Sequence, residues 1–126
     1  MIFLVDDDTS VLKSVRRLLR SDGLAVQTFS EASAFLSYIS TNRVELVVLD
    51  IRMKQVTGLE VLARLCALSP QTRVIIITGR EDLAARSIAN QVGAVGFFIK
   101  PLDDEEFLSV VHHALGRCRG CETKVP

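Results

Sequence analysis

Residues 45–50 read ELVVLD, a run of four apolar side chains that ends in an aspartate. The run shows no alternation of polar and apolar residues, which is typical of a parallel strand covered by helices on both faces. Similar runs recur along the chain, and the strands we expect are residues 2–5, 24–29, 45–49, 73–77 and 95–99. The run at 24–29 is interrupted by Gln27 and Thr28, so we expect it at an edge of the sheet.

Amphipathic helical stretches alternate with these five runs. Ser30 is a good N-cap for the second helix, Thr57 and Glu60 form a capping-box pattern for the third, and Gly93 can end the fourth. The apolar positions that mark the helices are Val11, Leu12, Val15, Leu18 and Leu19; Phe35, Leu36 and Ile39; Leu62, Leu65 and Cys66; Leu83, Ile88 and Val92; and Phe107, Leu108, Val111, Ala114 and Leu115. The last helix is entered through Asp103 and Asp104. The pattern predicts a doubly wound (βα)5 α/β sandwich.

Composition sets bounds on function. The chain has 126 residues, 15 basic and 15 acidic side chains, and no net charge, which argues against a nucleic-acid or anionic-membrane surface. Mean hydropathy is +0.31, but no apolar run approaches the ~18 residues of a membrane span. The start of the chain lacks signal-peptide features, and three cysteines form no closed disulfide set, so we expect a cytoplasmic protein.

Unusual polar residues follow the expected strands. Asp6, Asp7 and Asp8 follow the first, Asp50 the third, Thr78 the fourth, and Lys100 the fifth. Ligand sites of open parallel sheets lie at the carboxyl ends of the strands, so these side chains are expected to converge there. Clustered carboxylates need compensation, which Mg²⁺ (or Mn²⁺) can supply, and a metal, a carboxylate, a hydroxyl and a lysine together suit phosphoryl chemistry.

The motifs FLVDDD, VVLDIRM, IIITG and FFIKP occur in the order found in the receiver domains of two-component response regulators, which the chain resembles from about residue 2 to residue 115. The run IKPLDDEEFLSVVHHAL is most similar to the FixJ subgroup. The resemblance implies a flavodoxin-like, CheY-like fold with strand order 2-1-3-4-5. It also implies a signalling switch rather than an enzyme, with at most self-catalysed phosphotransfer and dephosphorylation.

The resemblance assigns a role to each site residue. Asp50 would accept the phosphoryl group from a sensor histidine kinase. Asp7 would bind Mg²⁺ directly, Asp6 would hold a metal-bound water or share the metal, and the backbone carbonyl of Arg52 would complete the protein ligands. Asp8 is instead expected to cap the first helix, in competition with Thr9.

The switch residues come from the last two strands. Lys100 would pair with the phosphoryl group, Thr78 would move toward it, and the Lys100–Pro101 peptide bond is cis in the family. The aromatic switch position is Phe97, where tyrosine is common. Phosphorylation would remodel the face formed by the fourth helix, the fifth strand and the last helix.

Several positions depart from the family pattern or compete with this interpretation. Lys54 stands where proline is usual, and it either attracts phosphate or points into solvent. Arg52 and Arg80 are expected at the rim of the site. His112 and His113 before Cys118 and Cys121 suggest a weaker zinc alternative, and Cys66 is expected in the core.

We expect residues 1–116 to form the receiver domain and 117–126 a tail or the start of a linker to an effector domain. The effector would be a DNA-binding, transcriptional one, and phosphorylation would favour a homodimer. Three alternatives from other classes remain. The first is an aspartyl-nucleophile phosphohydrolase, although Arg52 stands where such an enzyme has its second acid. The second is a nucleotide- or flavin-binding domain, although no glycine-rich loop follows the first strand. The third is an interaction module that is not phosphorylated.

Overall fold

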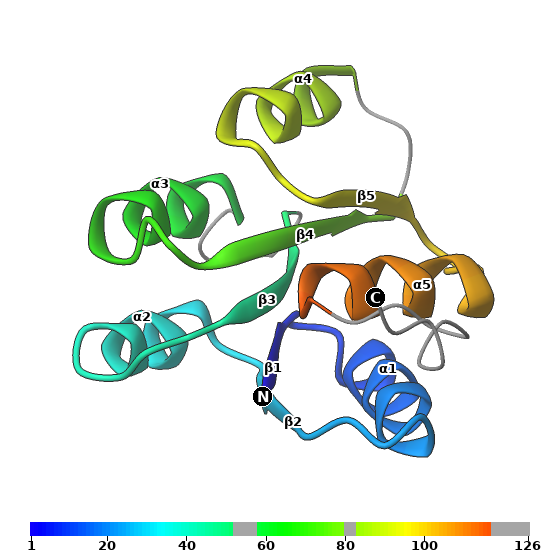
Figure 1. The fold of residues 1–126 in the computed structure, drawn as a ribbon. Coiled ribbons are helices and arrows are strands. Elements are labelled where there is room, and N and C mark those ends of the chain that lie inside the picture. The colour runs from blue at the N-terminus through cyan, green and yellow to red at the C-terminus, as the bar shows by residue number, and fades with distance from the viewer. Residues whose placement is uncertain (52–57, 80–82, 117–126) are drawn as a thin grey trace, which may run out of the picture.

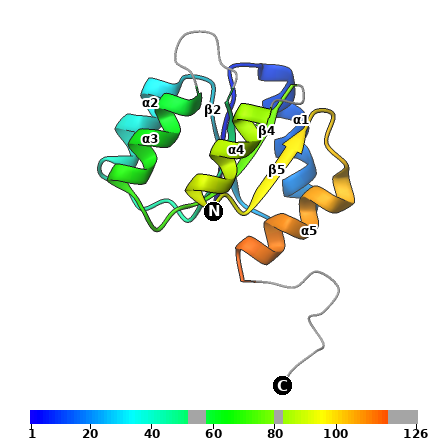
Figure 2. The ribbon, with the colours of Figure 1, turned by 90° about the horizontal axis from the view of Figure 1, so that it is seen from above.

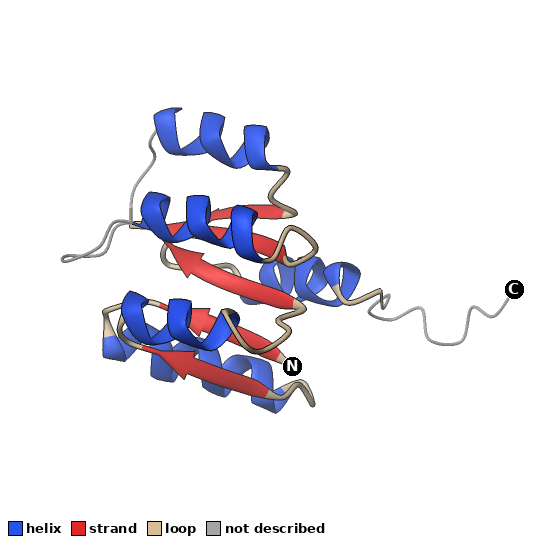
Figure 3. Ribbon diagram, turned by 90° about the vertical axis from the view of Figure 1, so that its left-hand side faces the viewer, coloured by secondary structure: helices blue, strands red, loops and turns tan. Residues whose placement is uncertain are grey.

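The computed structural model describes residues 1–51, 58–79 and 83–116. Its sheet has the order β2-β1-β3-β4-β5, and every neighbouring pair is parallel (Figure 3). None of the helices in these ranges has the length and apolar character needed to cross a membrane. The elements are β1 (Ile2–Val5), α1 (Thr9–Ser21), β2 (Val26–Phe29), α2 (Ala32–Ile39), β3 (Leu46–Asp50), α3 (Gly58–Leu68), β4 (Arg73–Thr78), α4 (Leu83–Val92), β5 (Gly96–Ile99) and α5 (Asp104–Ala114).

The helices form a layer on each side of the sheet. Helices α1 and α5 cover one face and α2, α3 and α4 cover the other (Figures 1 and 2). Alternate residues of each strand point to opposite faces, so Phe3 and Val5 join the core beneath α2–α4, whereas Ile2 and Leu4 join the core beneath α1 and α5. The uninterrupted apolar runs therefore fill two separate cores, and the expected doubly wound fold is confirmed.

The strand boundaries differ slightly from those expected. Strand β2 lies at an edge, as its mixed sequence predicts, but it begins at Val26 rather than at residue 24. Strands β3 and β4 extend one residue further than expected, because Asp50 pairs with Ile77 and Thr78 pairs with Ile99. The backbone ladder thus continues into the polar residues at the strand ends and fixes their positions.

Helix ends follow the expected capping residues in three of four cases. A carboxylate oxygen of Asp8 accepts hydrogen bonds from the backbone nitrogens of Ser10 (2.9 Å) and Val11 (3.4 Å), and Asp103 accepts one from Glu106 (3.0 Å). Gly93 ends α4 with a φ of 74°. The expected cap Ser30 is wrong, because the N-cap of α2 is Glu31, whose side chain makes no capping bond. Thr57 of the capping-box pattern lies outside the described residues.

Two predictions about the core were wrong. Leu83 and Val92 are exposed (79% and 38%), because α4 lies on the sheet through the small side chains of Ala85 and Ala89. Cys66 is also exposed, because the preceding residue, Leu65, takes the buried position on α3. Apolar spacing identified both helices correctly but not the exact face that each one buries.

The start of α3 lies directly against the end of β3. A Cβ added at Gly58 would lie 2.5 Å from the backbone oxygen of Asp50 and nearer still to the Cα of Ile51. The Gly58 nitrogen donates a hydrogen bond to the Ile51 oxygen (3.2 Å). No side chain fits between these two stretches of backbone, so the close approach requires glycine.

We expect Gly58→Ala to lower the free energy of unfolding by about 1–3 kcal/mol, because backbone rather than a flexible side chain must move. Urea unfolding followed by circular dichroism measures this. Gly79→Ala is the matched control, because a Cβ there meets nothing within 4 Å, and it should change stability by less than about 0.5 kcal/mol. Equal stability of the two variants would contradict the prediction.

Candidate functional site

Three carboxylates meet at the carboxyl edge of the sheet. Asp6 and Asp7 follow β1, Asp50 ends β3, and these two strands are neighbours in the sheet. One oxygen from each of the three side chains lies within 4.8 Å of the others. Asp6 and Asp50 are only 1% and 3% exposed, and Asp7 is half-buried. Negative charges this close together repel one another unless a positive charge compensates them.

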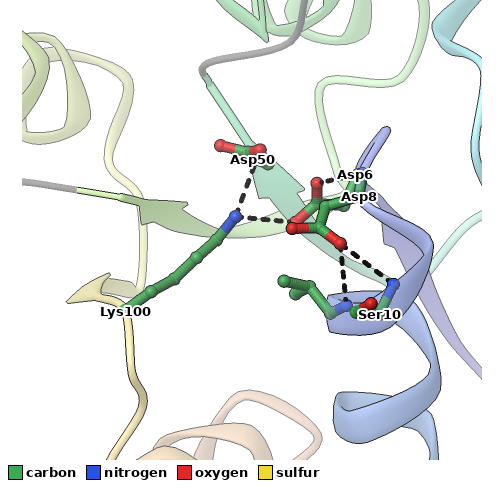
Figure 4. Close-up of polar contacts among 6 residues, drawn as sticks. Asp6, Asp8, Ser10, Asp50 and Lys100 are labelled. Carbon is green, nitrogen blue, oxygen red and sulfur yellow. Dashed lines mark hydrogen bonds and ion pairs between the residues drawn. The ribbon is translucent and has the colours of Figure 1, made fainter.

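Lys100 supplies that positive charge. Its Nζ donates to an Asp6 carboxylate oxygen at 2.9 Å and to an Asp50 oxygen at 3.3 Å (Figure 4). Lys100 follows β5 at the edge of the sheet, so its long side chain reaches past β4 to both acids. The Lys100–Pro101 peptide bond is cis. The ammonium therefore bridges carboxylates from two other strands.

Burial and charge act on the Lys100 ammonium in opposite directions. Burial alone lowers the pKa of Lys100, because the charged form loses hydration. The hydrogen bonds to Asp6 and Asp50 and the negative charges of both carboxylates raise it more strongly, so the pKa of Lys100 lies above its ordinary value. The side chain is thus firmly cationic at neutral pH.

Asp8, the third of the three consecutive aspartates that follow β1, has a different role. Its backbone nitrogen donates to an Asp6 carboxylate oxygen at 2.9 Å, while its own carboxylate caps α1 through Ser10 and Val11 (Figure 4). Asp8 is not part of the three-carboxylate group. The expected capping role of Asp8 is confirmed, and its backbone also helps to orient Asp6.

Thr78 and Phe97, the two predicted switch residues, belong to the neighbouring strands β4 and β5. Thr78 ends β4 and is fully buried. Its backbone oxygen accepts a hydrogen bond from the backbone nitrogen of Lys100 (2.8 Å). Phe97 lies on the face covered by α4, where the guanidinium of Arg86 is 4.5 Å from the centre of its ring. Arg86 was not singled out from the sequence, because no spacing rule links a residue of α4 to a ring on β5.

The predicted residues of the loops are not all covered by the structure. Arg52, the proposed carbonyl ligand, and the predicted rim residues Lys54 and Arg80 lie outside the described residues. The same holds for Cys118 and Cys121 of the zinc alternative. Of the two histidines in that alternative, His112 is engaged elsewhere, with its Nε2 2.5 Å from a carboxylate oxygen of Asp22 at the end of α1.

The donor set fits a hard divalent cation. Carboxylate oxygens are the ligands that Mg²⁺ and Mn²⁺ prefer, and Mg²⁺ keeps several waters beside one or two carboxylates. Asp7 is the most accessible member of the group, and Asp6 and Asp50 contribute two further carboxylates that are almost completely buried. The site can therefore hold a cation next to a carboxylate that an ammonium also contacts.

Comparison with known proteins gives a consistent family. A family model for the response regulator receiver domain matches residues 2–112. Response regulator protein TodT of Pseudomonas putida is 39% identical over 115 residues, which cover 91% of this chain and 51% of TodT. Transcriptional regulatory protein FixJ of Azorhizobium caulinodans is 37% identical over 116 residues, which cover 92% of this chain and 55% of FixJ. The chain thus spans about half the length of the curated relatives it matches.

Solved structures agree with this comparison. The CheY-like response regulator receiver domain protein of Methanospirillum hungatei JF-1 superposes with a TM-score of 0.84 at 28% identity. The match covers 91% of this chain and 92% of that one. The strand order and the helix layers are therefore those of a known fold.

We expect Mg²⁺ to bind the three carboxylates and Asp7→Asn to weaken that binding at least about tenfold. Mutation of a residue that only hydrogen-bonds to a metal ligand already lowers metal affinity by about that factor. Asp7→Asn should also raise the thermal midpoint of the metal-free protein, because it removes one of three clustered negative charges. Isothermal titration and scanning calorimetry measure the two effects. Asp8→Asn is the control, because it removes the same charge one residue away and Asn also caps helices. Equal Mg²⁺ affinities of the two variants would refute the assignment.

We also expect Lys100→Met to destabilise the metal-free protein by about 3 kcal/mol at neutral pH, because two buried carboxylates lose their cation. The pKa of Lys100 is raised by folding, so its contribution is complete below the pKa of the unfolded chain and disappears as the pH rises through the folded-state pKa. The difference from wild type should therefore stay constant up to about pH 9.5 and shrink above about pH 10.5.

Urea unfolding across this pH range measures the difference. Lys13→Met, which removes an exposed lysine of α1, is the matched control and should have little effect at any pH. If the difference in unfolding free energy between wild type and Lys100→Met does not shrink at the most alkaline pH at which the protein still folds, the ammonium is not the stabilising group.

Proposed function

The chain belongs to the response regulator receiver domain family, and we propose that it accepts a phosphoryl group on Asp50 from a sensor histidine kinase. The observation that carries this proposal is the contact of the Lys100 ammonium with both Asp50 and Asp6 beside Asp7. This arrangement combines a carboxylate nucleophile with the positive charge that a transferred phosphoryl group requires.

The reaction uses the chain's own groups in a simple way. An Asp50 carboxylate oxygen attacks the phosphorus, the new O–P bond forms, and the P–N bond to the donor histidine breaks, so that the imidazole nitrogen keeps the bonding electron pair. Lys100 moves its hydrogen bond from the carboxylate to a phosphoryl oxygen and neutralises charge there. The product is an acyl phosphate on Asp50.

Asp7, Asp6, Asp50 and the backbone carbonyl of Arg52 would hold Mg²⁺ or Mn²⁺, which neutralises negative charge on the phosphoryl oxygens. The three carboxylates support this assignment by their distances. Lys54 and Arg80 would lie at the rim of the site.

The acyl phosphate would carry about −1.5 to −2 charges next to the end of β4, in place of the single negative charge of the carboxylate. Thr78 would move toward it and Phe97 would follow, which would remodel the surface of α4, β5 and α5. Moving a 1:99 equilibrium to 99:1 requires about 5.5 kcal/mol. Charge-assisted hydrogen bonds to Lys100 and Thr78 can supply much of that difference.

The wider context follows from the relatives. TodT is named a response regulator and FixJ a transcriptional regulator, and the matched residues cover only 51% of TodT and 55% of FixJ. Residues 1–116 would then be the receiver domain and 117–126 the start of a linker to an effector domain that controls transcription. The protein would work in the cytoplasm as a phosphorylation-dependent switch, and phosphorylation would favour a homodimer.

Incubation with Mg²⁺ and acetyl phosphate, followed by intact-mass measurement, tests the proposal. We expect wild type to gain one phosphoryl group that alkali removes, and Asp50→Asn to gain none. Asp22→Asn is the control. It changes a carboxylate at the C-terminal end of α1, whereas the site lies at the N-terminal end, and this variant should be labelled like wild type.

Other outcomes would support the competing functions. Steady hydrolysis of varied phosphate esters without a lasting adduct would indicate a phosphohydrolase. The absence of any adduct with acetyl phosphate and with a phosphorylated histidine kinase would indicate an interaction module that is not phosphorylated.

A further inference from the structure

The side chains of Arg86 and Phe97 form a contact between α4 and the edge strand β5. The Arg86 guanidinium carbon lies 4.5 Å from the centre of the Phe97 ring, within the ~6 Å at which a cation is attracted by the face of an aromatic ring. Arg86 is exposed and Phe97 is half-buried. The guanidinium thus covers part of a ring that the core alone leaves open to water.

Phe97 faces α4 rather than the opposite helix layer. It packs against the core that contains Ala85 and Ala89 of α4, whereas its neighbour Phe98 packs against Phe107 of α5 on the other face (ring centres 5.5 Å apart). Figure 2 shows α4 running beside β4 and β5. The position of the Phe97 ring is therefore tied to α4.

The same ring is close to the functional site along the strands. Phe97 pairs with Ile76, and two residues further on Ile99 pairs with Thr78. Lys100 is the next residue after Ile99, and its backbone nitrogen donates a hydrogen bond to the backbone oxygen of Thr78. A displacement of Phe97 would therefore be passed along β5 and its ladder with β4 toward Lys100 and Thr78, the two residues that would contact a phosphoryl group.

On the α4 side, few large side chains of the described residues hold this part of the sheet. Strand β5 has a neighbour on one side only, and α4 contacts the sheet through two alanines and the half-buried Ile88. With so few large side chains at this contact, one guanidinium on a ring is a substantial part of it.

We propose that Arg86 is a positioning residue of the switch, whose guanidinium holds the Phe97 ring against α4 and so opposes the arrangement adopted on phosphorylation. The inference rests on the proposed function and adds to it a residue that sets the resting balance between the two forms. An exposed cation–π contact corresponds to a factor of about two to five in an equilibrium constant. Removing the contact should shift the switch by that factor toward the phosphorylated form.

Beryllium fluoride with Mg²⁺, a phosphoryl analogue, is the probe, and titration calorimetry gives its affinity. We expect Arg86→Met, which keeps the aliphatic stem and removes the charge, to bind it about two- to fivefold more tightly than wild type. Arg86→Lys keeps a cation and should lie nearer to wild type. Affinity for Mg²⁺ alone should be the same in all variants, because the side chains that would hold the metal are those of Asp6, Asp7 and Asp50.

A double-mutant cycle separates the ring contact from a general effect of α4. In a Phe97→Leu background the Arg86→Met substitution should no longer change the affinity for beryllium fluoride. Arg64→Met, an exposed arginine of α3, is the matched control and should behave like wild type in both backgrounds.

The two proposals fail in different ways. If wild type binds beryllium fluoride but Arg86→Met binds it equally or more weakly, or if its gain persists with Phe97→Leu, the role of Arg86 is refuted and the proposed function stands. If wild type binds no beryllium fluoride and gains no phosphoryl group from acetyl phosphate, the proposed function is refuted, and the role of Arg86 with it.

Discussion

The ammonium of Lys100 and the two carboxylates it contacts are the interaction on which the rest of the site depends. Asp6 and Asp50 are almost completely removed from water, and a buried carboxylate without a cation is costly. The contacts at 2.9 and 3.3 Å bring one positive charge to both acids. The same cation would then be available to a phosphoryl group, so the group that stabilises the resting site would also serve the proposed phosphoryl transfer.

The sheet brings these groups together through its backbone. The register pairs Asp50 with Ile77 and Thr78 with Ile99, so the polar residues continue the ladder at the carboxyl edge. Asp8 fixes the orientation of Asp6 through its backbone nitrogen and starts α1 with its side chain. Gly58 allows α3 to begin directly behind Asp50. Local features of three different elements thus hold one cluster of side chains in position.

Sequence reasoning predicted the order of elements, the edge position of β2 and the convergence of the acids with Lys100, because strand runs and their terminal residues are local features. It failed where tertiary packing decides. Ser30 has the right chemistry for a cap, yet the helix begins after Glu31. Leu83 fits an apolar stripe, yet α4 turns its alanines to the sheet. The contact of Arg86 with Phe97 joins separate elements, and no local pattern encodes it.

The position of each strand in the sheet has a consequence for how the site can change. Asp50 ends β3, which is hydrogen-bonded to β1 on one side and to β4 on the other, whereas Lys100 follows β5, which has β4 alone beside it. A shift of β3 would disturb two ladders, but a shift of β5 would disturb one. Asp50 is therefore the anchored member of the site and Lys100 the adjustable one, so structural rearrangement should spread outward from the β5 side while the β1–β3 half stays fixed.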